Sequence, residues 1–281
     1  MTLKEKIKTI KNDGLRKKEK KEIKKHYWYI ANAQEYLKDD EEVIYSVVSK
    51  NQDYFKYASD RLKKSPEFIL FLLQNSFNNT TIVDEGDLFE YIDKNLKKDK
   101  AFVLRSLILS RANIIEYVDK TLRDDKDVGL AAIAQNNNNL RYLSDKLKDD
   151  FEIVSEAVKL YSPEIQYASD RLKNDETIVQ LVIDSNYIVY EYIGNKIRDN
   201  KNFMLKNIKE HPEIFEYLSE KLRNDKEIIF TAISGKYSSS YDCIKHISKN
   251  LLNNKAFLKE IEEKDSYALE LIHELLKENN K

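Results

Sequence analysis

One phrase of about twelve residues returns along the chain, and this internal repetition constrains the fold more than any other feature. Its copies read YASDRLKKSPEF, YIDKNLKKDKAF, YVDKTLRDDKDV, YLSDKLKDDFEI, YASDRLKNDETI, YIGNKIRDNKNF and YLSEKLRNDKEI. Self-similarity at a fixed period of roughly 20 to 50 residues is the signature of stacked structural units. The chain is therefore a tandem repeat.

The apolar residue before a basic residue in each copy gives a common reference, which we call the anchor. The anchors are Leu37, Leu62, Leu96, Leu122, Leu147, Leu172, Ile197, Leu222 and Leu251, and Leu276 begins a half unit. Most intervals between anchors are 25 residues long. Two longer intervals indicate insertions at residues 75–87 and 235–241. Positions are numbered from the anchor, so that +3 lies three residues after it.

Apolar residues follow helical spacing on both sides of the anchor. They stand at −8, −7 and −4, as in Ile214, Phe215 and Leu218, and again at +6, +7, +10 and +11. At about 100° per residue, each set forms one stripe on a helix. Each unit is therefore predicted to be a helical hairpin, with one helix before the anchor and one after it.

Every unit also carries a helix-capping residue at +3. These residues are Asp40, Ser65, Asp99, Asp125, Asp150, Asp175, Asn200, Asp225 and Asn254. Their side chains accept hydrogen bonds from the first turn of a helix. Lys or Arg follows the anchor at +1 in eight of nine units, where it complements the C-terminus of the first helix. The second helix is therefore predicted to begin directly after +3.

Glycine and proline are scarce, with five and three residues in 281. Sandwiches, barrels and nucleotide-binding folds need these residues at tight turns, so their scarcity favours helices. The predicted fold is an all-α solenoid, a superhelical array of about nine 25-residue helical hairpins. Residues 1–26 form a basic N-terminal segment that caps the array, residues 27–264 form the array, and residues 265–281 form a C-terminal capping helix.

Units such as YASDRLKNDETIVQLVIDSN and YLSEKLRNDKEIIFTAI resemble the repeat family labelled domain of unknown function forty-one sixteen. The resemblance covers residues 54–233 and implies the helical fold, but it implies no activity. The chain departs from the family's Asn-Gly at the end of the second helix, with Asn136 and Asn137 in one unit. Because Asn adopts the left-handed C-cap conformation second best after Gly, we expect the turn to remain.

No motif indicates catalysis. The four histidines lack metal-ligand spacing, and the sequence has no HExxH, CxxC or glycine-rich phosphate loop. We therefore expect no enzyme activity, no cofactor and no metal ion. The single cysteine, Cys243, suits a reducing compartment, and the sequence has neither a signal peptide nor a membrane span. We expect a cytoplasmic protein that does not bind membranes.

Two rows of residues are candidate binding surfaces. Tyrosine stands at −5 in Tyr57, Tyr91, Tyr117, Tyr142, Tyr167, Tyr192 and Tyr217. This row is either an aromatic seam between neighbouring units or a stacking platform for bases or for a partner's side chains. A second row at +8 contains Tyr45, Leu70, Leu104, Leu130, Leu205 and Phe230. It is either buried on several sides or lines an exposed groove.

Charge is unevenly distributed. Residues 1–25 contain eleven Lys or Arg against four Asp or Glu, a net charge of +7, which leaves −8 for the remainder of a chain of net charge −1. The lysines Lys17, Lys18, Lys20 and Lys21 are candidates for contacts with phosphate or with an acidic partner. The alternative is a capping helix in which Ile7, Ile10 and Ile23 cover the open end of the array.

In repeat arrays, residues with a binding or catalytic role often lie in insertions. The first insertion contains the acidic residues Asp84, Glu85 and Asp87, and the second contains a serine-rich stretch. Both are either simple loops or parts of a contact surface. A hydrolase with a site assembled across units is a third reading of the acidic cluster.

Together these features favour a non-enzymatic scaffold that binds proteins, such as an inhibitor or regulator of a larger macromolecular complex. The alternative is an RNA- or DNA-binding repeat protein that uses the basic N-terminus and the tyrosine edge. The protein would then bind nucleic acid either alone or as part of a ribonucleoprotein. The two readings differ in their dependence on salt, because phosphate contacts weaken steeply as the salt concentration rises.

Overall fold

The computed structural model of the chain describes residues 14, 16–75, 86–110, 113–185, 189–234 and 243–278. Within these residues every regular element is a helix, which confirms the predicted all-α class and the repeated helical units. Packing divides the chain into two compact units, Met1–Leu147 and Lys148–Lys281.

The first unit starts with a helix over residues 16–25. It continues with η1 (Tyr27–Asn32), α2 (Glu35–Lys38), α3 (Glu41–Val48), η2 (Gln52–Tyr57), α4 (Asp60–Lys63), α5 (Pro66–Asn75), α6 (Gly86–Tyr91), η4 (Leu96–Lys98), α7 (Lys100–Leu109), η5 (Ile114–Tyr117), η6 (Leu122–Asp124), α8 (Lys126–Gln135), η7 (Leu140–Tyr142) and α9 (Asp145–Lys148), where η denotes a 3₁₀ helix.

The second unit follows the same order of elements. It contains α10 (Phe151–Leu160), η8 (Ser162–Tyr167), α11 (Asp170–Lys173), α12 (Glu176–Ile183), η9 (Tyr190–Tyr192), α13 (Asn195–Arg198), α14 (Lys201–Asn207), η10 (Pro212–Tyr217), α15 (Glu220–Arg223), α16 (Lys226–Ile233), α18 (Lys249–Leu252), α19 (Lys255–Lys264) and α20 (Ser266–Glu278).

Each repeat has three helical pieces where the sequence predicted two helices. A turn of 3₁₀ helix such as η2 is followed by two extended residues, here Ala58 and Ser59, by a short helix such as α4, and by a long helix such as α5. The short helix is a three-residue 3₁₀ turn in η4 and η6. The prediction of one continuous first helix is wrong because the residue at −3 is itself a cap. Ser59 has extended backbone and its Oγ accepts a hydrogen bond from the Leu62 amide, so a new helix starts there.

The long helices begin where the sequence predicted. All nine residues at +3 accept a backbone amide of the following turn through their side chains. Asp150, for example, accepts from the amides of Glu152 at 3.0 Å and Ile153 at 3.1 Å. The ends of these helices differ from expectation, since no described non-glycine residue has a positive φ. Asn136 is extended, and its Oδ1 accepts from the Asn138 amide at 2.9 Å.

Successive repeats are joined by the same pair of positions, which we call the junction pair. It consists of the residue at +2 of one repeat and the residue at −3 of the next. Four junction pairs join an aspartate to a serine hydroxyl: Asp39 with Ser59, Asp124 with Ser144, Asp149 with Ser169, and Asp199 with Ser219. The serine hydroxyl bond is the leading cause that lowers the pKa of each of these four aspartates. The serine thus caps its own short helix and holds the preceding repeat.

A backbone hydrogen bond accompanies these pairs. The amide at −3 donates to the carbonyl at +1 of the preceding repeat, as in Ser59 to Lys38 at 2.9 Å and Ser219 to Arg198 at 3.1 Å. Side chains at +1 stabilise their own repeat. The Nζ of Lys63 and of Lys97 donates to the carbonyl of Lys56 and of Glu90, respectively. Partial burial lowers the pKa of both lysines.

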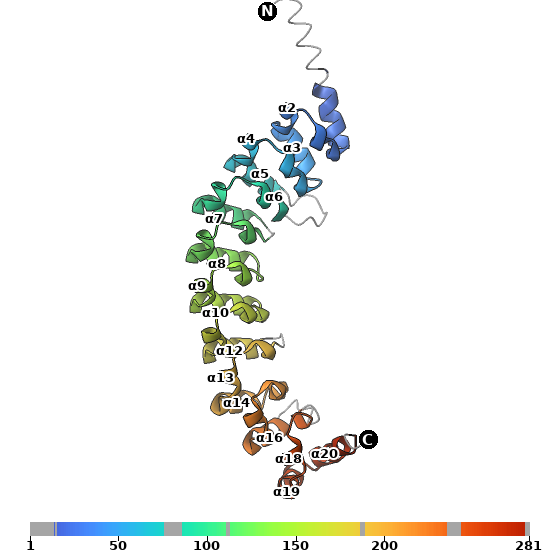
Figure 1. Cartoon of the computed structure of the whole chain (residues 1–281), viewed down its shortest axis with the longest axis vertical. Coiled ribbons are helices and arrows are strands. Elements are labelled where there is room, and N and C mark those ends of the chain that lie inside the picture. The colour runs from blue at the N-terminus through green and yellow to red at the C-terminus, as the bar shows by residue number, and fades with distance from the viewer. Residues whose placement is uncertain are drawn as a thin grey trace, which may run out of the picture. The chain divides into compact units, whose positions relative to one another are not determined.

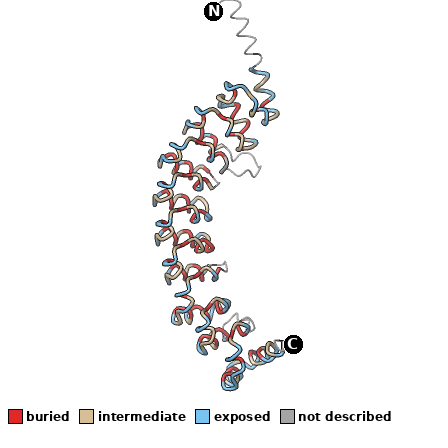
Figure 2. The backbone as a smooth tube through the Cα atoms, in the orientation of Figure 1, coloured by how far each residue is buried: buried red, intermediate tan, exposed pale blue. Residues whose placement is uncertain are grey.

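The core lies between the long helices and the turns that pack on them. In the first unit α3, α5, α7 and α8 pack in sequence order, and in the second unit α10 packs on α12 and α14 on α16 (Figure 1). Seven of the nine anchors are buried, whereas Leu96 and Leu251 are half-buried, and Leu252 is buried beside the latter. Buried positions recur in every repeat (Figure 2). At roughly 25 cal/mol per Å² of apolar surface, this burial is the main stabilising contribution.

The helix at 16–25 packs on the first repeat in the position that the long helix of a preceding repeat would occupy. In two repeats the lysine at +4 bonds to the cap of the next repeat: Lys100 to Asp125 and Lys201 to Asp225, both at 2.8 Å. Lys20 contacts the cap Asp40 in the same way, and Ile23, three residues later, is buried at 3% exposure. The capping role predicted for Ile23 agrees with this placement, whereas Ile7 and Ile10 lie outside the described residues.

Candidate functional site

A groove runs between two long helices of the first unit, α5 and α7. It has a volume of about 410 Å³, and its apolar lining includes Leu70, Phe71 and Leu109. Phe71 is 45% exposed, and its ring lies 5.4 Å from the ring of Tyr45 between centroids. Ile108, one turn from the groove on α7, is 80% exposed. We call Leu70, Phe71, Ile108 and Leu109 the long-helix patch.

A groove at corresponding positions lies in the second unit, between α16 and α19. It measures about 570 Å³, and Phe230 occupies the +8 position that Leu70 occupies in the first groove. Here charged side chains cover the ring. Lys264 Nζ lies 4.9 Å from the Phe230 ring centroid, and Lys226 Nζ lies 2.6 Å from Glu260 Oε1. The groove position therefore recurs in both units, while the exposed apolar lining belongs to the first.

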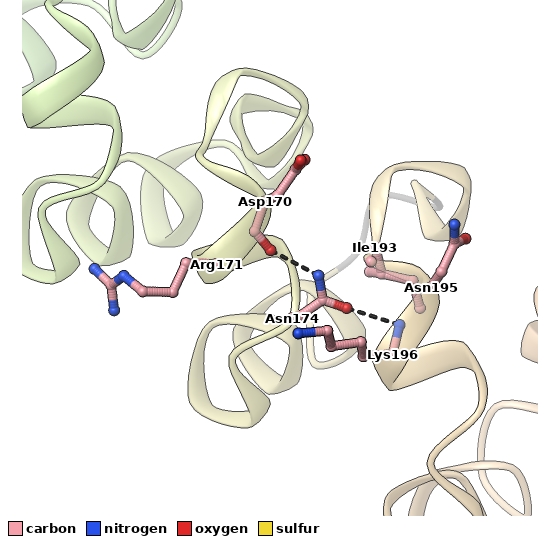
Figure 3. Close-up of a pocket in the computed structure, with 7 residues that line it drawn as sticks. Asp170, Arg171, Asn174, Ile193, Asn195 and Lys196 are labelled. Atoms are coloured by element: carbon pink, nitrogen blue, oxygen red, sulfur yellow. Dashed lines mark hydrogen bonds between the residues drawn. The ribbon is translucent and has the colours of Figure 1, made fainter.

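A third hollow, of about 810 Å³, lies at a junction that lacks the serine (Figure 3). Gly194 occupies −3 and Asn174 occupies +2. The Asn174 side chain fills the place of the serine hydroxyl, because its Oδ1 accepts from the amides of Lys196 at 2.9 Å and Ile197 at 3.3 Å. A Cβ at Gly194 would lie 2.1 Å from that oxygen. This hollow is thus the result of an altered junction pair, and most of the residues that line it are of polar or charged types.

The tyrosines at −5 lie between repeats, and all seven are half-buried. Tyr142 is hydrogen-bonded to Glu116 of the preceding repeat, and burial followed by this bond raises its pKa. Tyr117 lies under Lys97 of the preceding repeat, with 5.9 Å from Nζ to the ring centroid. Tyr217 lies 5.9 Å from the ring of Tyr190, which belongs to the preceding repeat. The row therefore contributes to contacts between repeats.

The other predicted residues are distributed over several places. In the row at +8 Leu70 is buried, while Tyr45, Leu104, Leu130, Leu205 and Phe230 are half-buried. Asp84 and Glu85 lie outside the described residues, as does the side chain of Asp87, whose backbone belongs to α6.

The candidate lysines lie on the helix at 16–25. Lys17, Lys18 and Lys21 are exposed, whereas Lys20 is paired with Asp40. Of the candidate positions, the structure thus brings Leu70 and Tyr45 into the neighbourhood of one groove, and the lysines onto a separate surface.

None of the large apolar residues that are exposed in the described part of the chain is a sequence-based candidate, and three of them are considered further. Phe71 and Ile108 stand at +9 and +12, and Trp28 stands at −9. A signal for Ile108 exists in the sequence, because seven of the eight other repeats carry a polar residue at +12 and the eighth carries Ala134. The polar residues include Ser49, Gln74, Lys159, Asp184 and Lys209. A large apolar residue at an otherwise polar position is the kind of departure that marks a contact surface.

Neither a metal centre nor a membrane span is found in the part of the chain that the structure describes. No group of three or more His, Cys, Asp or Glu side chains there is arranged to hold a metal ion. Among the same residues, no helix combines the length and apolar character that crossing a bilayer requires.

Comparison with known proteins places the repeats in a family. The family model described as a domain of unknown function, DUF4116, matches residues 40–85, 106–148, 150–198 and 200–242. These four segments cover more than half of the chain and confirm the resemblance of the repeated phrase. No curated protein and no solved structure matches the chain.

Proposed function

Because this chain belongs to the DUF4116 family, a repeat family with no described function, we propose its role from its own surfaces: a non-enzymatic scaffold that binds a protein partner. The repeats of each unit form an α-solenoid, and the scaffold acts as an inhibitor or regulator of a larger complex. The observation that carries the proposal is the long-helix patch of the first unit.

The patch supports binding because two of its apolar side chains are not buried by the fold. Leu70 is buried in the fold, but Phe71 and Ile108 leave large parts of their side chains in water. Exposed apolar side chains beside a groove are typical of interaction sites. The neighbouring Arg105 and Glu67 at the groove give a polar rim.

The partner segment that fits this groove is apolar, in the manner of one face of an amphipathic helix laid against a groove. Phe71 and Ile108 are its principal contacts. Full burial of a Phe or Ile side chain contributes roughly 1.5 to 3 kcal/mol, so a partly exposed one is expected to change the dissociation constant by about tenfold.

The test is site-specific photocrosslinking followed by reconstitution. A photoreactive amino acid at position 108 identifies partners in cells, and each purified partner is then titrated against Phe71→Asp and Ile108→Asp. Tyr267→Asp is the matched control, because Tyr267 is a similarly exposed apolar residue on α20. The proposal requires a partner whose affinity falls about tenfold in both groove variants and is unchanged in the control. Equal affinity in all three proteins would reject it.

A further inference from the structure

The N-terminal surface of the first unit combines exposed aromatic rings with a basic helix, and it is separate from the long-helix patch. Trp28 is 52% exposed and Tyr29 is 53% exposed, and both belong to η1. The helix at 16–25 precedes them and carries seven Lys or Arg against Glu19 and Glu22. These residues lie before residue 40, where the first segment matched by the family model begins.

Trp28 is not required at its position by the fold. It stands at −9, where six other repeats carry polar residues and two carry Pro163 and Ile188. The six are Asp53, Asp87, Asn113, Asn138, Glu213 and Asp242. Its neighbour Ile30, at −7, supplies the core residue of the turn and is fully buried. Among the described residues at −9, Asn138 and Glu213 are exposed, Asp53 and Asn113 are half-buried, and Pro163 is buried. At this position a tryptophan that is 52% exposed leaves a large apolar surface in water.

Neighbouring rings hold Trp28 in place. Its ring centroid lies 5.0 Å from that of His26 and 5.4 Å from that of Tyr27. Tyr27 in turn packs edge-on against Tyr54 of the next repeat, with centroids 5.1 Å apart. The exposed Trp28 ring is therefore held in one position by its contacts with the folded repeats. This lowers the entropic cost of stacking a ligand on the ring.

Tyr29 lines a groove of about 410 Å³ between η1 and the basic helix. Lys18 and Glu22 contribute from the helix, and the amide side chains of Asn32 and Gln34 from the other wall. Amide groups can pair with the edges of nucleobases, since each offers both a donor and an acceptor.

The charges of the helix divide into two sets. Lys20 and Lys24 pair with Asp40 and Glu42, so they attach the helix to the repeats. Two acids of the helix line the groove with Tyr29: Glu19 accepts a hydrogen bond from the Tyr36 hydroxyl, and Glu22 is exposed. Lys17, Lys18, Lys21 and Lys25 are exposed to solvent. The outward charge of this surface is therefore positive.

From this arrangement we propose that the surface formed by Trp28, Tyr29 and the exposed lysines Lys17, Lys18 and Lys21 binds single-stranded nucleic acid. Bases stack on the two rings, and the lysines contact phosphates. Stacking on aromatic side chains combined with a basic track is the general mode by which single strands are bound with little sequence preference. The protein-binding proposal above does not enter this argument.

Trp28 is the only tryptophan of the chain, so its fluorescence reports directly on the site. The full chain is titrated with U12, dT12, a duplex of the same length and poly-glutamate. We expect quenching by both single strands, with an affinity that falls about 20- to 50-fold between 50 and 200 mM salt if three or four phosphates are contacted. The comparison of U12 with dT12 distinguishes RNA from DNA.

Two sets of variants complete the test. Trp28→Ala, followed by anisotropy of a labelled strand, is expected to weaken binding about tenfold or more. The triple variant Lys17→Glu, Lys18→Glu, Lys21→Glu is compared with Lys64→Glu, Lys94→Glu, Lys120→Glu, which changes the same charge at exposed lysines of the same unit. The first triple variant should lose binding while the second retains it. Absent quenching, equal loss in both triple variants, equal binding of the duplex or of poly-glutamate, or unchanged affinity of Trp28→Ala would each overturn the proposal.

Discussion

The altered junction pair at Gly194 and Asn174 permits a test of how repeats are joined. In Gly194→Ser the new Cβ would lie 2.1 Å from Asn174 Oδ1. Because this distance is too short for two non-bonded atoms, the Asn174 side chain must move. It then loses its bonds to the amides of Lys196 and Ile197 and its own donation to the Asp170 carbonyl at 2.6 Å. Each such bond contributes about 0.5 to 1.5 kcal/mol net.

Because the new serine replaces part of the lost capping, we expect Gly194→Ser to cost about 1 to 2 kcal/mol in the free energy of unfolding. Asn174→Asp alone is expected to cost about 1 kcal/mol, since a carboxylate then faces the Asp170 carbonyl in place of an amide donor. The double variant recreates the serine–aspartate pair that four other junctions have. Its free energy of unfolding should therefore return to within about 0.5 kcal/mol of the parent, which is a coupling of more than about 1 kcal/mol.

The assay is urea denaturation of the four proteins, followed by circular dichroism, with hydrogen exchange of the peptide spanning α13 as the local measure. A reciprocal cycle at Asp199 and Ser219, with Asp199→Asn and Ser219→Gly, is the control and should show coupling of the same sign. Additive effects in the first cycle, within about 0.3 kcal/mol, would refute the view that these two residues form one exchangeable unit.

Two further predictions concern the aspartates. Asp175→Ala should destabilise the second unit by about 0.5 to 2 kcal/mol because Asp175 caps α12 through the amides of Thr177 and Ile178, and urea denaturation should show a much smaller loss for Asp175→Asn. For Asp149, the Ser169 hydroxyl and then Arg171 lower the pKa, so the unfolded chain binds the proton more tightly and stability is lost as the pH falls below about 4. Asp149→Asn should reduce this loss, as measured by urea midpoints between about pH 6 and 3, and an unchanged acid dependence would contradict the assignment.

The long helices could be predicted because their start depends on residues close in sequence. A cap such as Asp175 acts on amides two and three residues away, so its role is visible in any single repeat. The first helix was predicted as continuous because −8, −7 and −4 share a face whether or not the backbone is broken between them. The break follows from the cap at −3, such as Ser169, which bonds the amide three residues later.

The junction pairs and the exposed surface were harder to predict. Asp149 and Ser169 are 20 residues apart and meet only after two repeats have packed, so neither residue indicates the bond on its own. Phe71 falls at +9, where residue type varies from repeat to repeat, and Ile108 is a single apolar residue at the mostly polar position +12, so neither belongs to a row of similar residues. Their importance comes from exposure, which depends on the packing of whole helices.

The division of each junction between two repeats has a consequence for how such chains change by duplication. Both partners of a repeat flank its short helix: the serine at −3 bonds to the preceding repeat and the aspartate at +2 bonds to the following one. A duplicated repeat whose short helix lies between a serine and an aspartate, as α9 lies between Ser144 and Asp149, therefore fits on either side of another of its kind. A copy inserted after Asn174 would instead set a serine against the asparagine, so Asn174 would have to leave its present position and adopt the arrangement of Asn224, whose Oδ1 accepts from the Ser248 amide at 3.2 Å. Recombination within this gene should therefore need no rearrangement at serine–aspartate borders, whereas at the glycine–asparagine border it requires the asparagine side chain to move.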